Sequence, residues 1–167
     1  KNNSIISDKD SHPFSVLYEG KHYSYVHNCG VTHDQDDNFI NSKSIKPRHF
    51  FPDSGNAAEK IFCYVMDELK VNQITEWNKD SFEFLNKTFL ELNNNRFLNA
   101  LMTEGENVFV YSSCVGYGMY AVHRDINTKE IQTKKTKTTH RFTQSEDHEE
   151  GWLFSTSKLT DENWVSL

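Results

Sequence analysis

The chain has 167 residues, of which 36% are hydrophobic and 13% aromatic, and its 24 acidic and 18 basic side chains leave a formal charge of -6. This apolar content suffices for a packed core, so we expect one globular domain over residues 1–167 rather than a disordered chain. The negative charge repels nucleic-acid phosphates and anionic lipid, which argues against nucleic acid and membrane surfaces as partners.

Location is indicated by hydropathy and by the cysteines. No apolar run approaches the roughly 20 residues of a membrane span, and the first ten residues lack the apolar centre of a secretory signal. Three widely spaced cysteines (Cys29, Cys63 and Cys114) do not form a disulfide framework. We therefore expect a soluble cytoplasmic protein with reduced thiols, with secretion as the open alternative. The first residue is Lys1 rather than Met, so we expect a processed product or the later part of a longer gene.

The first elements form a predicted hairpin. Residues 14–18 and 22–28 are rich in aromatic and β-branched side chains, and residues 19–21 supply a glycine for the turn. Residues 29–56 are polar and hold two prolines and two glycines, which is typical of a long loop. The hairpin therefore delivers Asn28 to the end of a strand.

Two amphipathic helices are predicted next. Asn56 and Glu59 have the spacing of a capping box, and apolar residues then recur at helical spacing, which predicts a helix over 57–70. A second such pattern predicts a helix over 80–94. Both apolar stripes indicate packing faces rather than cofactor sites.

The period then changes to two. Residues 97–103 and 107–112 predict another hairpin, and residues 119–124 and 151–157 predict further strands. The basic, Thr-rich run 134–141 is best explained as a solvated edge strand protected by lysines. Strands, two helices and further strands predict an α+β fold with antiparallel sheets.

The polar corner after the first hairpin is the candidate site. His27 and Cys29 would lie on one face of a continuing strand, but about 6.6 Å apart along it, beyond the reach of a thiol–imidazole hydrogen bond. A local Cys–His nucleophile would need a sharp turn at Asn28. A zinc site formed by His27, Cys29 and His33 has suitable ligand types, but the spacing matches no standard zinc motif. We therefore predict neither a metal nor a cofactor, and a zinc-binding domain stays as a third alternative that does not depend on any family resemblance.

A third role suits an Asn-x-Gly sequence at a strand end. The side-chain amide of Asn28 and a backbone N–H at a glycine-permitted corner are two donors that can converge on an oxygen with developing negative charge. Such an oxyanion hole needs no local nucleophile, because the nucleophile can come from a distant segment.

Four sequence blocks resemble one known family. The blocks are SHPFSVLYEGKHYSYVHNCG, GNAAEKIFCYVMDEL, FLNALMTEGENVFVYSS and FSTSKLTDENWVSL. They are similar, in this order, to the THPF…FAHNG block, the DSE helix, the LTDGE hairpin and the final EPLT…WV strand of class II glutamine amidotransferases. These are N-terminal-nucleophile hydrolases, and the four blocks cover most of the chain.

This resemblance implies a fold, a reaction and roles for residues. The fold would be a sandwich of antiparallel sheets and helices, incomplete in this chain. In the family, an N-terminal cysteine attacks the glutamine amide and releases ammonia to an acceptor. Asn28 would be the side-chain donor to the oxyanion and Cys29 the backbone N–H donor. The implied partners are glutamine or a related small amide, with a partner subunit or an ammonia-acceptor enzyme.

The chain also departs from the family pattern. The nucleophile and the substrate-binding arginine would lie before Lys1, and Cys29 stands where the family has glycine. Ala57 replaces the aspartate of the DSE motif, and Asp53 in the preceding loop is the predicted substitute that binds substrate. The alternative function is therefore a degenerate, non-catalytic member that acts as a binding or scaffolding domain.

Overall fold

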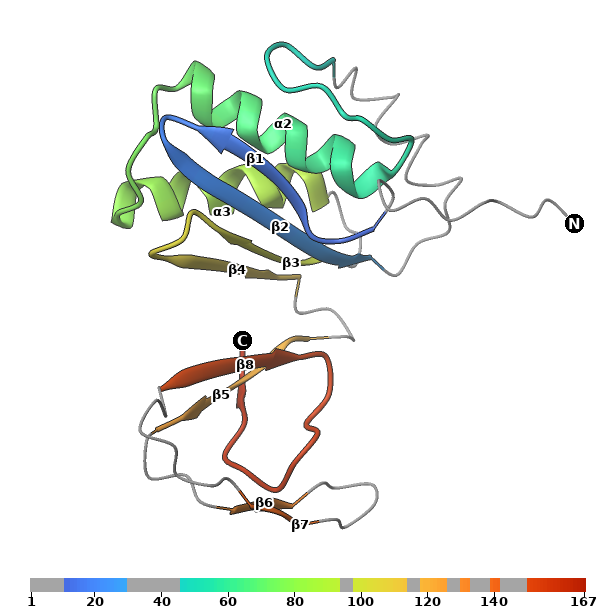
Figure 1. The fold of residues 1–167 in the computed structure, drawn as a ribbon, viewed down its shortest axis with the longest axis vertical. Helices are drawn as coiled ribbons and strands as arrows, with labels where there is room; N and C mark the ends of the chain where they lie inside the picture. The colour runs from blue at the N-terminus through green and yellow to red at the C-terminus, as the bar shows by residue number, and fades with distance from the viewer. Residues whose placement is uncertain are drawn as a thin grey trace, which may run out of the picture. The chain divides into compact units, whose positions relative to one another are not determined.

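The computed structural model describes residues 11–29, 46–93, 98–113, 118–125, 130–132, 139–141 and 150–167. Its elements, in chain order, are β1 (Phe14–Tyr18), β2 (Lys21–Cys29), α2 (Ala57–Val71), α3 (Lys79–Asn93), β3 (Leu98–Thr103), β4 (Val108–Ser112), β5 (Tyr120–Arg124), β6 (Glu130–Gln132), β7 (Thr139–Arg141), β8 (Gly151–Ser155) and β9 (Val165–Ser166). The predicted α+β class with antiparallel sheets is confirmed (Figure 1). The chain divides into two compact units, 1–113 and 114–167, and the expectation of a single domain stays a prediction.

The first unit is built on a four-stranded antiparallel sheet with the order β1-β2-β3-β4. The predicted first hairpin forms, with Phe14 opposite Tyr25 and Tyr18 opposite Lys21. Its turn consists of Glu19 and Gly20, both at positive φ, which is the backbone twist that two-residue hairpin turns prefer. β2 is longer than predicted and includes Cys29.

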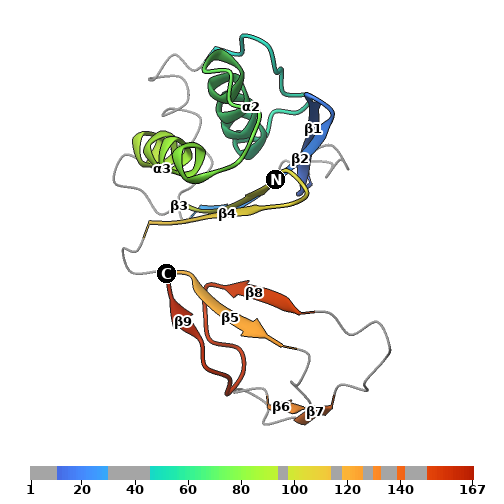
Figure 2. The ribbon, with the colours of Figure 1, turned by 90° about the vertical axis from the view of Figure 1, so that its left-hand side faces the viewer.

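Both helices cover one face of this sheet (Figure 2). The fully buried Tyr25 of β2 stacks on Phe62 of α2, with ring centroids 5.4 Å apart, and on Phe89 of α3, at 6.2 Å. This aromatic layer removes apolar surface from water and fixes the two helices on the sheet.

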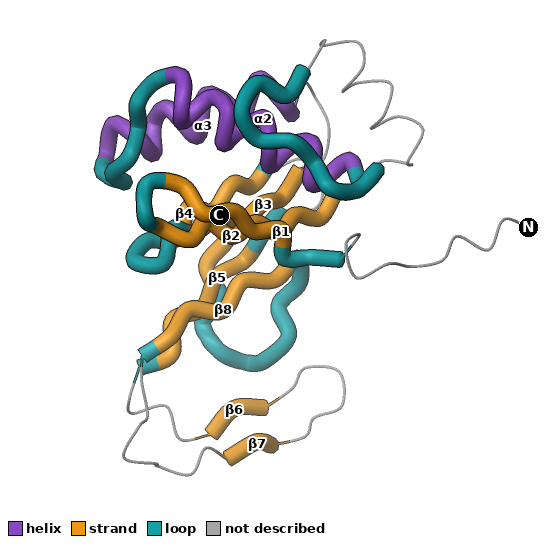
Figure 3. The backbone as a smooth tube through the Cα atoms, turned by 45° about the horizontal axis from the view of Figure 1, so that its top comes forward, coloured by secondary structure: helices purple, strands orange, loops and turns teal. Residues whose placement is uncertain are grey.

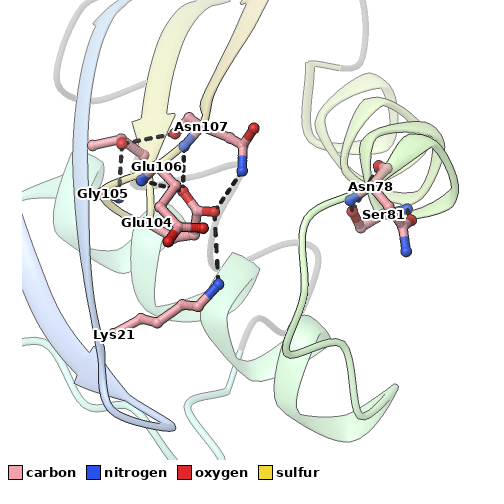
Figure 4. Close-up of polar contacts among 8 residues, drawn as sticks. Lys21, Asn78, Ser81, Glu104, Gly105, Glu106 and Asn107 are labelled. Atoms are coloured by element: carbon pink, nitrogen blue, oxygen red, sulfur yellow. Dashed lines mark hydrogen bonds and ion pairs between the residues drawn. The ribbon is translucent and has the colours of Figure 1, made fainter.

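The helices begin at asparagine caps. Asn56 accepts the N–H of Ala58 at 2.9 Å, and α2 then runs one residue beyond the predicted end. At α3, Asn78 accepts the N–H of Ser81 at 3.1 Å, and Ser81 Oγ accepts the N–H of Asn78 at 2.6 Å. This reciprocal pair is labelled in Figure 4 and accounts for a helix that starts at Lys79.

The second unit contains a three-stranded sheet with β5 between β8 and β9, and a two-stranded sheet of β6 and β7. The predicted strands 119–124 and 151–157 are confirmed with slightly shorter bounds. β6 was not predicted, and β9 was indicated only by the resemblance to the family's EPLT…WV strand. Arg124 donates two hydrogen bonds of 2.9 Å to Glu162, which also accepts the hydroxyl of Thr160. Hydrogen bonds from Arg124 hold the pKa of Glu162 below its ordinary value, so this network stays ionised.

Parts of the sequence predictions fall outside the described residues. Of the predicted loop 29–56, residues 30–45 are not described, and of the basic run 134–141 only β7 is. Within the described ranges, neither helix has the length and apolar character that crossing a membrane would require.

Candidate active site

Asn28 lies near the end of β2, directly opposite Asn99 of β3. Side chains alternate between the two faces of a strand, and Tyr25 points toward the helices. Asn28 therefore points away from the helices, and its side chain is exposed. The side chain of Asn28 makes no hydrogen bond or ion pair to another described residue, so the N–H groups of its carboxamide are available to a ligand.

The backbone N–H of Cys29 points away from β3, toward the edge of β2 that pairs with β1. Leu98, the partner of Cys29 on β3, accepts a hydrogen bond from Ser113 at 3.2 Å on the side of β4. In an antiparallel sheet both polar groups of one residue face the same neighbour, so Cys29 and Leu98 form a non-hydrogen-bonded pair. The N–H of Cys29 thus faces the β1 edge, where the described β1 pairing ends at Phe14 and Tyr25.

The neighbouring His27 faces the helices and is not a solvent-facing base. The hydroxyl of Tyr25 lies 2.8 Å from His27 Nδ1. Burial, helped by the nearby His12 ring, lowers the pKa of His27 to about 4. The imidazole is therefore neutral near pH 7, and the Tyr25 hydroxyl is the natural donor to its Nδ1. His27 supports the strand end beneath Asn28.

The loop before α2 carries Asp53, the predicted substrate-binding residue. Glu59 Oε1 accepts the backbone N–H of Asp53 at 2.9 Å, and Glu59 Oε2 accepts the backbone N–H of Ser54 at 2.7 Å and its hydroxyl at 2.5 Å. The predicted capping box is therefore only half correct. Asn56 caps the helix, but its own N–H donates to Ser54 Oγ at 3.1 Å. Glu59 instead accepts hydrogen bonds from Asp53 and Ser54, which form the corner before the helix.

A second carboxylate holds the start of the same loop. Asp67 is completely buried in α2, where it accepts the backbone N–H groups of Arg48 at 2.7 Å, His49 at 2.7 Å and Phe50 at 3.1 Å. The Arg48 guanidinium also pairs with the neighbouring Glu68. The loop therefore lies along α2 as a fixed segment (Figure 3).

These contacts place Asp53 and Asn28 at the same end of the unit. Phe50 packs edge-on against Tyr18 near the β1–β2 turn, and Lys70 of the last turn of α2 lies over the Phe50 ring. The C-terminus of α2 is therefore at the turn end of the hairpin, and its N-terminus, with Asp53, is at the end where β2 stops after Asn28 (Figure 1). The two side chains make no direct hydrogen bond to each other.

Among the described residues, the other candidate groups add neither a nucleophile nor a metal site. Burial, with Glu59 and other carboxylates nearby, raises the pKa of the Cys63 thiol to about 12, so this thiol is inert packing. His33 and Cys114 lie outside the described residues. In the part of the chain that the structure does describe, no three His, Cys, Asp or Glu side chains gather in a metal-binding group.

A buried carboxylate at the other end of the sheet is structural. Glu104 in the β3–β4 hairpin accepts the N–H of Asn107 at 2.7 Å and its side-chain amide at 2.8 Å, and Lys21 Nζ lies 3.8 Å away (Figure 4). Burial raises the pKa of Glu104, but the hydrogen bonds outweigh it and the net pKa is lowered. Lys21 begins β2, so this cluster lies about 23 Å along the strand from Asn28. It closes the hairpin.

A surface cavity of about 480 Å³ is also separate from the candidate site. It is lined by the α2–α3 connection and the first turns of α3. Neither Asn28 nor Asp53 lines it.

With this geometry in view, comparison with known proteins decides the family. The family model of class-II glutamine amidotransferases matches residues 2–167. The chain belongs to the class II glutamine amidotransferases. The resemblance drawn from the four sequence blocks is thereby confirmed.

Two relatives give the extent of the family likeness. An uncharacterized protein of Methanocaldococcus jannaschii is 24% identical over 171 residues, which cover 95% of this chain and 42% of that protein. The crystal structure of a predicted glutamine amidotransferase from Pseudomonas aeruginosa has a TM-score of 0.64 at 19% identity, over 96% of this chain and 60% of that one. This structure supports the fold alone. The chain spans less than half the length of the first relative and about three fifths of the second.

The structure shows roles of two residues that the sequence predictions missed. Glu59 was predicted to bond to the cap residue, because sequence spacing does not show which N–H a side chain reaches. Asp67 had a signal, since a charged residue interrupts the apolar stripe IFCYVMDEL, but its loop partners are 17 to 19 positions away.

Proposed function

We propose that the intact protein hydrolyses the side-chain amide of glutamine or of a related small amide. The nucleophile would be the thiolate of an N-terminal cysteine encoded before Lys1. Its attack on the amide carbon forms a tetrahedral oxyanion, whose collapse releases ammonia and leaves a thioester, and water then hydrolyses the thioester to free the acid. The proposal rests on one observation above all: in a chain that the family model matches over residues 2–167, the Asn28 amide is exposed at the end of β2.

The proposed roles follow from the positions of the donors. The Asn28 amide and the Cys29 N–H would donate to the oxyanion, which carries more charge than the ground-state carbonyl oxygen. Cys29 can serve although it is not glycine, because the donor belongs to the backbone. The Asp53 carboxylate, exposed at the same end of the unit, would bind the ammonium group of the substrate. Ammonia would be lost or passed to an acceptor enzyme or subunit.

The second candidate function is a non-catalytic binding or scaffolding domain. One observation favours it: Ala57, at the position of the family's aspartate, is only 4% exposed and belongs to the hydrophobic core. The chain therefore has no carboxylate at that position, and the proposed function depends on Asp53 as the replacement.

Ammonia release from glutamine by the full-length gene product separates the two functions. We expect the wild-type protein to release ammonia and Asn28→Ala to lower kcat by roughly 10²–10³-fold, the usual effect of removing one oxyanion donor. Asn86→Ala, which removes an exposed asparagine of α3, is the matched control and should leave the rate unchanged. A full-length protein without activity would favour the non-catalytic function.

A further inference from the structure

We infer that Glu59 is a positioning residue, which fixes the Asp53–Ser54 corner so that the Asp53 carboxylate meets the ammonium group of an α-amino-acid ligand. This inference rests on the proposed function, because it assigns the ligand-binding step of that site. The new element is the role of Glu59, the residue through which Asp53 is held in place.

Glu59 holds the backbone on both sides of the Asp53 α-carbon. Its two carboxylate oxygens together accept three hydrogen bonds, from the N–H groups of Asp53 and Ser54 and from the Ser54 hydroxyl. Hydrogen bonds to a charged acceptor are shorter and stronger than those between neutral groups. Both peptide groups that flank the α-carbon of Asp53 are therefore restrained, because one contains the N–H of Asp53 and the next contains the N–H of Ser54.

The Asp53 carboxylate is the group of this corner that remains for a ligand. The donors occupy the Glu59 carboxylate, whereas the Asp53 side chain is exposed and bonds to no other described residue. Asp53 thus presents the unengaged carboxylate of the corner, and a carboxylate in that state suits a cationic ligand group. The corner lies at the same end of the unit as the Asn28 amide, so one amino-acid ligand can present an ammonium group to Asp53 and its amide to Asn28.

The loop before α2 is restrained on both sides of this corner. Asp67 holds the N–H groups of residues 48–50 and Glu59 holds those of residues 53 and 54, so only Phe51 and Pro52 lie between the two carboxylates. A loop restrained on both sides loses little further conformational entropy when a ligand binds. Removal of the Glu59 contact should therefore weaken ligand binding through the geometry of Asp53, not through lost charge at the ligand itself.

The test is ligand affinity in the full-length protein, measured by calorimetry with L-glutamate and with glutarate. Glutarate lacks the α-ammonium group, and neither compound can be turned over. The wild-type protein should prefer glutamate. Asp53→Asn should abolish the preference, and Glu59→Gln should reduce glutamate affinity by roughly tenfold with little change for glutarate, as expected for lost hydrogen bonds to a charged group.

Matched variants separate positioning from helix capping. Asn56→Ala removes the cap of α2 without touching the Glu59 contacts, and it should lower stability yet retain the preference for glutamate. Ser54→Ala removes one of the three donors to Glu59 and should cause a smaller loss than Glu59→Gln, which keeps the inference testable if that variant does not fold.

The outcomes distinguish the two proposals. A protein that prefers glutamate and depends on Glu59, but releases no ammonia, would refute the proposed catalysis and leave this inference standing. Equal affinity of the wild-type protein for glutamate and glutarate, or no binding of either, would overturn the inference. Loss of the preference in Asn56→Ala to the same extent as in Glu59→Gln would overturn it as well.

Discussion

Replacement of Asp67 by asparagine is the sharpest perturbation of the fixed loop. Asp67 Oδ1 accepts the N–H groups of His49 and Phe50 at 2.7 and 3.1 Å, and Oδ2 accepts that of Arg48 at 2.7 Å. The oxygen of an asparagine side chain can keep two of these bonds, but the NH₂ group then faces the third N–H. Two donors then face each other at a buried site, and neither has an acceptor. The lost charge and the unsatisfied donor together should cost about 2–4 kcal/mol.

The assay for Asp67→Asn is amide hydrogen exchange, because the effect is local to the loop. At 1.4 kcal/mol for each factor of ten, protection of the amides of residues 48–50 should fall by roughly 30- to 1,000-fold. Glu68→Gln is the control: it removes only the exposed pair with the Arg48 side chain and should change protection by less than about fivefold. Unchanged protection in Asp67→Asn would refute the account of the loop.

Three further predictions concern the titratable groups of His27, Glu104 and Cys63. The pKa of His27, about 4, lies below the usual 6.5, so on acidification the unfolded chain takes up a proton at His27 before the folded protein does. The free energy of unfolding should therefore fall by up to about 3 kcal/mol between pH 6.5 and pH 4. An NMR titration midpoint of His27 near 6.5 in the folded protein would contradict this. Because the pKa of Glu104 is lowered in the folded protein, the ionised carboxylate stabilises the fold above the pKa of the unfolded chain, and this stabilisation is lost on acidification. Glu104→Gln should therefore speed hydrogen exchange of the Glu106 and Asn107 amides by roughly tenfold at pH 7. An unchanged exchange rate would contradict this. The Cys63 thiol, with a pKa of about 12, should resist an aromatic disulfide reagent at pH 8 until urea is added, and rapid labelling of Cys63 in the folded protein would contradict its burial.

Local patterns were enough to predict most elements of the fold. The Glu19–Gly20 turn and the alternation around Tyr25 predict the first hairpin, and the apolar spacing after Asn56 predicts α2 within one residue at its C-terminus. These signals are local, because turn conformation and helical periodicity depend on residues a few positions apart. β9 is only two residues long and is held by pairing with β5, so its sequence carries no comparable signal.

The candidate site was only partly predictable. The motif around Asn28 predicted the strand end, and the structure adds that the Cys29 N–H faces the edge away from β3. The hydrogen bonds from Asp53 and Ser54 to Glu59 could not be deduced from sequence spacing. The capping-box pattern names the correct carboxylate, but the loop backbone decides which N–H groups come within reach. Three-dimensional contacts thus determined how Asp53 is presented.

The most direct test of the central claim, that Asn28 and the Cys29 N–H stabilise the oxyanion, compares two ligands in the full-length protein. The γ-semialdehyde of L-glutamate would form a tetrahedral adduct with the catalytic thiol, whereas L-glutamate cannot. Donors that act on the oxyanion strengthen binding of the tetrahedral species selectively. We predict that Asn28→Ala weakens inhibition by the aldehyde roughly 10²-fold and leaves glutamate affinity unchanged. An equal effect on both ligands, or none on the aldehyde, would contradict the claim.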